Sequence, residues 1–105
     1  MVTAADARRL ALSLPGAAER DHHGRPSFRV NRKIFATLWD AGHMNVMLDE
    51  GGILTAVQAD PDRCEEVWWG QRLAAVRVTL ELAEPDFLAG LLEQAWELKA
   101  AGRAG

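Results

Sequence analysis

The sequence predicts an α+β fold, a two-layer sandwich in which an antiparallel sheet packs against N- and C-terminal helices. Three observations support this prediction. Apolar residues recur at helical spacing near both ends of the chain. Between the ends, apolar and polar residues alternate as they do along β-strands. Short turns separate these segments, which suits neighbouring antiparallel strands and leaves little room for the crossover helices of a parallel sheet.

The first helix is expected to begin near Thr3. Residues 3–6 (TAAD) have the form of a capping box, in which the threonine hydroxyl and the aspartate carboxylate accept hydrogen bonds from free backbone N–H groups. Pro15-Gly16 ends the helix. Its apolar face carries Ala7, Leu10, Ala11 and Leu14.

Three strands in a meander are expected next. Residues 26–30 alternate, with Phe28 and Val30 on one side, and Asn31-Arg32 reads as a two-residue hairpin turn. The run 33–39 is rich in strand formers and is predicted to be a central strand covered on both faces.

The remaining elements complete the sandwich. After a tight turn at 40–42, residues 43–48 form the third strand, and a short helix follows 49–52 and stops near Asp60-Pro61. Strict alternation over 73–82 predicts a further strand. A broad apolar stripe then predicts a C-terminal helix whose pattern is lost at 100–102.

Composition indicates one soluble, cytoplasmic domain over residues 1–105. Apolar residues make up 49% of the chain and charged residues 26%, which is typical of globular proteins. Cys64 is the only cysteine, so no internal disulfide forms, and no apolar run is long enough to cross a membrane. The net charge is −3, yet residues 1–33 carry seven basic and three acidic residues, which leaves −7 for the rest. A basic face is therefore conceivable on an acidic protein.

Six short segments, in this order and spacing, resemble the MmcQ/YjbR family over roughly residues 5–99. They are 12–16 (LSLPG), 24–30 (GRPSFRV), 33–36 (KIFA), 69–70 (WG), 76–80 (VRVTL) and 91–96 (LLEQAW). The resemblance implies a fold like that of the bacterial frataxin homologue CyaY. Members of the family are described as DNA-binding proteins in which two hairpins act as a double wing.

The resemblance places the wing tips at 31–33 and 40–42, of which only the first is basic. It implies no catalytic residues. The resemblance gives no reason to expect iron binding of the frataxin type. That function depends on an acidic first helix, whereas the first helix here carries one acidic residue, Asp6, and two basic residues, Arg8 and Arg9.

Basic residues around the first hairpin are the candidate nucleic-acid contacts, since guanidinium groups near a narrow turn can reach phosphates. These candidates are Arg25, Arg29, Arg32 and Lys33. The competing interpretation is an ordinary solvated strand face. Phe28 and Phe35 are expected in the core, which leaves three tryptophans for base stacking. They are Trp39, Trp68 and Trp69.

A second hypothesis is a small-molecule or protein-interaction module that uses a cleft between sheet and helices. The candidate rim residues are His22, His23, Trp39 and Trp68. No metal site is expected, because neighbouring residues such as His22 and His23 point to opposite faces of a strand unless the segment is irregular.

A third hypothesis, an enzyme, needs a pocket that joins a histidine to a carboxylate. Ser13, Ser27 and Cys64 do not lie in a nucleophile elbow, and Glu65 and Glu66 are expected to disfavour the Cys64 thiolate. No catalytic residue and no cofactor is predicted. The leading hypothesis is therefore a non-enzymatic protein that binds DNA through the hairpin from Arg29 to Lys33.

Overall fold

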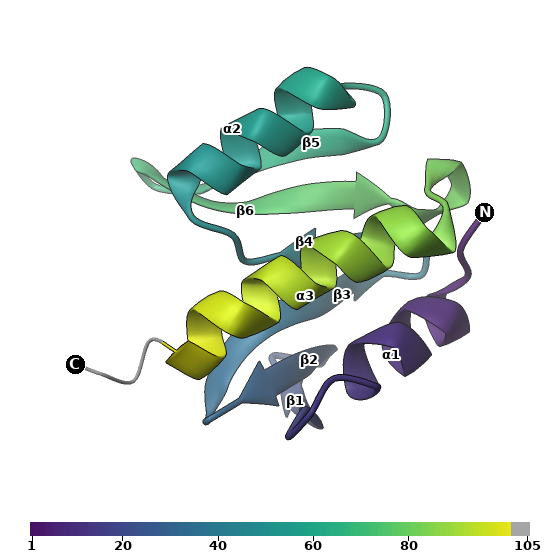
Figure 1. Ribbon diagram of the computed structural model, residues 1–105, viewed down its shortest axis with the longest axis vertical. Coiled ribbons are helices and arrows are strands. Elements are labelled where there is room, and N and C mark those ends of the chain that lie inside the picture. Colours follow the sequence, from purple (N-terminus) through teal and green to yellow (C-terminus); the bar gives the residue numbers. More distant parts are fainter. Residues whose placement is uncertain (102–105) are drawn as a thin grey trace.

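The computed structural model describes residues 1–101 and contains one six-stranded antiparallel sheet (Figure 1). The strands lie in the order β1-β2-β3-β4-β6-β5, so the first four follow the sequence and β5 forms an edge beyond β6. The strands are β1 (Ala18–His22), β2 (Arg25–Val30), β3 (Lys33–Asp40), β4 (His43–Val46), β5 (Cys64–Trp69) and β6 (Arg72–Thr79). The helices are α1 (Ala4–Leu12), α2 (Glu50–Ala59) and α3 (Pro85–Ala101), with a 3-10 turn η1 (Leu80–Leu82) after β6.

All three helices lie on one face of the sheet (Figure 1). The predicted capping box starts α1: the Thr3 hydroxyl accepts from the Asp6 N–H at 3.0 Å, and the Asp6 carboxylate accepts from the Thr3 N–H at 3.1 Å. Asp49 caps α2 by accepting the Gly52 N–H at 2.8 Å. The long helix α3 packs against β3 and α1. The predicted α+β sandwich is confirmed.

The hydrophobic core fills the space between the helices and the sheet. Phe28 of β2 and Phe35 of β3 are fully buried there, as predicted, against Leu88 and Leu92 of α3. Fully burying one such side chain contributes about 1.5–3 kcal/mol to folding. Burial of apolar side chains on this side therefore stabilises the packing of the helices on the sheet.

The other face of the sheet carries no helix among residues 1–101 (Figure 1). We call it the bare face. Three polar residues on its central strands are nevertheless buried. They are Ser27, Thr37 and Asn45. A small apolar cluster of Met47, Val67 and Ala75, with Ile34 packed against it, lies on the same face.

Two edge strands were not predicted from the sequence. All five residues of β1 are exposed, so no apolar alternation marks it, and its pairing with β2 is made by the backbone. In β5 only Cys64 and Val67 are buried, and the two belong to apolar clusters on opposite faces of the sheet, so no one-sided apolar pattern marks this strand either. The predicted three-stranded meander is therefore the middle of a larger sheet.

Three further expectations need correction. The strand β3 is central, but helices cover only one of its faces. The strand predicted over 73–82 is too long at its C-terminal end. The strand β6 ends at Thr79, and the side chain of Leu82 in η1 is about half exposed. The helix α3 continues to Ala101, and Gly102 lies outside the described residues. Within residues 1–101, no helix is both long and apolar enough to cross a membrane.

Candidate functional site

A groove of about 1050 Å³ runs along the bare face over β2, β3, β4 and β6. It extends from the β1–β2 turn to the β2–β3 hairpin and the start of α2. Cationic side chains outnumber carboxylates along it. The cations are Arg25, Arg29, Arg32, Lys33, Arg72 and Lys99, and the carboxylates are Asp49 and Glu50. The groove is thus electropositive on a protein of net charge −3.

Three arginines of the bare face are held to the sheet through their Nε atoms. Arg25 Nε donates to the Trp39 carbonyl oxygen at 2.8 Å, and Arg29 Nε donates to Ser27 Oγ at 3.2 Å. Arg77 Nε donates to Asn45 Oδ1 at 2.9 Å. We call these three the anchored arginines. None of them forms an ion pair within the described chain, so the terminal NH₂ groups of each guanidinium stay available to a ligand.

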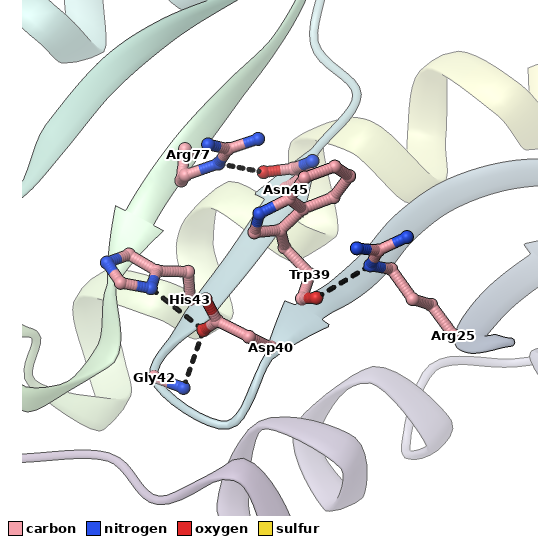
Figure 2. A network of polar contacts seen from close by, with 7 residues as sticks. All are labelled: Arg25, Trp39, Asp40, Gly42, His43, Asn45 and Arg77. Atoms are coloured by element: carbon pink, nitrogen blue, oxygen red, sulfur yellow. Dashed lines mark hydrogen bonds and ion pairs between the residues drawn. The ribbon is translucent and has the colours of Figure 1, made fainter.

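The indole of Trp39 lies between two of these guanidinium groups, beside the Asn45 amide (Figure 2). The Arg25 Cζ is 3.9 Å from the ring centroid, and the Arg77 Cζ is 4.5 Å from it. Each contact is a cation–π interaction worth about 0.5–1 kcal/mol at an exposed site. Trp39 keeps 37% of its surface exposed. The three planar groups therefore form one stiff, partly exposed platform across β2, β3 and β6.

Hydrogen bonds in the β3–β4 turn fix the end of the strand that carries Trp39. Asp40 Oδ1 accepts the Gly42 N–H at 2.8 Å and lies 2.8 Å from His43 Nδ1 (Figure 2). The bond to His43, followed by the one to Gly42, lowers the pKa of Asp40 below its ordinary value. An ionised Asp40 only accepts, so Nδ1 of His43 carries the proton. This turn, the second wing tip implied by the family resemblance, holds its carboxylate in internal bonds and is not basic.

The β2–β3 hairpin has the predicted two-residue turn. Asn31 and Arg32 have φ of 52° and 68°, the left-handed conformation that asparagine tolerates better than most residues. The Asn31 amide donates to the Ala100 carbonyl oxygen of α3 at 3.1 Å. The hairpin tip is therefore fastened to the end of α3, and Lys99 reaches the same groove.

Most of the sequence-predicted site residues meet in this one groove. The four basic candidates Arg25, Arg29, Arg32 and Lys33 line it together with His22, His23 and Trp39. Trp68 does not. It pairs with the core residue Leu73, so it faces the helix side of β5, and its indole donates to Glu66 at 2.9 Å. The predicted cleft between sheet and helices is also wrong, because the hydrophobic core fills that space.

Several site residues were missed by sequence reasoning. They are Asn45, Arg72, Arg77 and Lys99. Arg77 had a signal, since it stands between Val76 and Val78 in the clearest alternating strand and so had to face away from the core. Its partner Asn45 is 32 residues away in the chain, and only the β4–β6 register brings the two together.

The β1–β2 turn brings two histidines together. His23 has φ of 55°, which breaks the strand alternation, and its ring centroid lies 4.5 Å from that of His22 in an edge arrangement. The segment is therefore irregular here, which is the case in which the two side chains were not expected to point apart. Within residues 1–101, no three His, Cys, Asp or Glu side chains are grouped so as to hold a metal ion.

Cys64 is buried under the helix layer, 3% exposed. Burial, with a smaller contribution from Asp60, raises the pKa of its thiol to about 11. The neighbouring Glu65 and Glu66, which the sequence suggested as the cause, are not what disfavours the thiolate. A thiol with this pKa is a weak nucleophile at neutral pH.

Comparison with known proteins identifies the family. The YjbR family model matches residues 12–98, most of the chain. No curated protein matches. The chain is similar in structure to the crystal structure of Deinococcus radiodurans protein DR2400, which has a DUF419 family-model domain. The TM-score is 0.79 at 20% sequence identity, with 97% of this chain and 82% of that chain covered. The fold agrees with the family that the sequence resembles, and the chain belongs to the YjbR family.

Proposed function

We propose that this protein binds DNA across the bare face of its sheet, with the anchored arginines contacting phosphates. The observation that supports the proposal is the state of Arg25, Arg29 and Arg77. Each is held by a neutral acceptor through Nε, and within residues 1–101 none is neutralised by a carboxylate.

Such an arrangement suits phosphate recognition. A guanidinium offers five N–H donors in a fixed fork, and the terminal pair can engage two phosphate oxygens at once. Holding the side chain through Nε reduces the rotamer entropy that binding would otherwise cost, which is about 0.5–1.5 kcal/mol for each immobilised side chain. The bare face is therefore preorganised for an anionic polymer.

The charge distribution supports a phosphate ligand despite the negative net charge of the protein. Counterion release on DNA depends on how many cations meet phosphates, and not on the net charge of the protein. Six cations against two carboxylates line the groove.

The proposal differs from a double-wing mode of binding. A wing projects from the body of a protein, whereas the tip of the β2–β3 hairpin is bonded to α3 by Asn31. Arg32 and Lys33 thus form one rim of the groove. On this proposal the basic hairpin flanks a binding surface whose centre is Trp39.

Fluorescence anisotropy of labelled DNA against the purified protein tests the proposal. Three phosphate contacts alone predict a slope of about −2.7 for log K against log salt concentration on duplex DNA. A neutral polymer serves as the competitor control and is expected to have no effect. Absence of binding even at low salt would contradict the proposed function.

A further inference from the structure

Building on the proposed function, we infer that the preferred ligand of the bare face is single-stranded nucleic acid. The strand runs along β2 and β3, with phosphates on Arg25 and Arg29 and bases against the Trp39 platform and Trp69. This inference rests on the exposed indoles, the spacing of the arginines and the shape of the face.

The indoles give the first reason. Trp39 and Trp69 both line the groove and are 37% and 53% exposed. The guanidinium of Arg72 lies 5.3 Å from the Trp69 ring centroid. In duplex DNA the faces of the bases are buried in the stack, so exposed indoles gain nothing from it. Unpaired bases stack on aromatic rings and on arginine guanidinium planes.

The spacing of the cations gives the second reason. Arg25, Ser27 and Arg29 share one face of β2, and the two arginines are four residues apart, about 13 Å at the rise of a strand. Arg32 and Lys33 continue the row at the hairpin. A straight row of cations suits the phosphates of a single nucleic-acid strand. Trp39 lies beside Arg25, the first residue of the row.

The shape of the face gives the third reason. Proteins that read base edges in the major groove of duplex DNA insert a helix or a two-stranded ribbon into it. The bare face has no helix among residues 1–101, and its basic hairpin is bonded back to α3. The cations line a hollow. A single strand exposes both its phosphates and the faces of its bases to the side chains that line such a hollow.

The chain offers a matched pair of tryptophans for the test. Trp68 and Trp69 are neighbours on β5 with equal exposure, 52% and 53%, but only Trp69 lines the groove. Affinities of wild type, Trp69→Leu and Trp68→Leu are measured by anisotropy with labelled oligothymidine, oligouridine and a duplex of equal length. Thermal melts confirm that both variants fold. The oligothymidine and oligouridine arms distinguish DNA from RNA as the source of the single strand.

We expect either single strand to bind tighter than the duplex. Loss of one stacked base weakens single-strand binding by about 5- to 150-fold in Trp69→Leu and leaves Trp68→Leu unchanged. Duplex binding as tight as single-strand binding would overturn this inference while leaving the proposed function intact. Equal weakening by both substitutions would overturn the stacking contact. Absence of binding to all three probes at low salt would remove the proposed function, and the inference with it.

Discussion

The arginines on the two faces of the sheet have different kinds of partner. On the helix-covered side, arginines are paired with carboxylates: Arg8 with Glu19, Arg9 with Asp6 and Arg63 with Asp60. On the bare face, the anchored arginines bond to a backbone carbonyl, a hydroxyl and an amide. The first arrangement neutralises charge, whereas the second fixes the side chain and keeps its charge. The arginines of the helix-covered side therefore form ion pairs, whereas the candidate binding arginines of the bare face do not.

The two faces also differ in what stabilises them. Apolar side chains are buried between sheet and helices, whereas the bare face buries the polar residues Ser27, Thr37 and Asn45. Within residues 1–101, no buried side-chain nitrogen or oxygen lacks a hydrogen-bond partner. Substitutions on the two faces should therefore separate effects on stability from effects on binding.

The largest expected effect is a difference in stability between substitutions at two adjacent residues of β2, whose side chains face opposite sides of the sheet. Phe28→Ala removes a fully buried ring and should lower the free energy of unfolding by about 3–5 kcal/mol. Arg29→Gln loses the bond to Ser27 and should cost about 1.5–3 kcal/mol at most, because this bond is made by a charged group. Urea denaturation measures both. Equal losses would mean that the arginines of the bare face are structural, and the comparison between the faces would fail.

A smaller effect is expected at Asn45, which is 3% exposed and holds Arg77. Asn45→Ala should cost about 1.5–3 kcal/mol, because a hydrogen bond to a charged group is lost. Asn45→Asp keeps a hydrogen-bond acceptor for Arg77, but the new carboxylate neutralises the positive charge of the guanidinium.

Urea denaturation and DNA anisotropy on the two Asn45 variants separate these roles. Asn45→Asp should be more stable than Asn45→Ala while binding DNA more weakly than wild type. Wild-type affinity in Asn45→Asp would show that Arg77 does not contact phosphate.

The fold could be predicted wherever one side of an element is apolar. The Asn31-Arg32 turn, the capping box at Thr3 and the alternation around Arg77 all have local signals that the structure confirms. The edge strand β1 has no such signal, because every one of its residues is exposed. Its position depends on backbone pairing with β2, and no side-chain pattern records that pairing.

The site could be predicted only in part, for a related reason. Its basic residues in β2 and β3 are close in sequence, so the cluster from Arg25 to Lys33 was visible. The platform joins Trp39 to Arg77 through the order β3-β4-β6, a relation set by sheet register. No spacing rule in the sequence specifies this register. Trp68 and Trp69 lie on opposite faces by the ordinary alternation of a strand, but only the pairing of β5 with β6 shows which of the two lines the groove.

The most direct test of the account compares two double variants with the same loss of charge. Arg29→Gln with Arg32→Gln changes the groove, and Arg8→Gln with Arg9→Gln changes paired arginines on α1. Anisotropy with labelled DNA is measured across a salt series. The account predicts that the groove variant binds more weakly, with a salt slope shallower by about 2, and that the α1 variant matches wild type. Equal weakening in both variants would contradict it, because binding would then follow net charge and not the bare face.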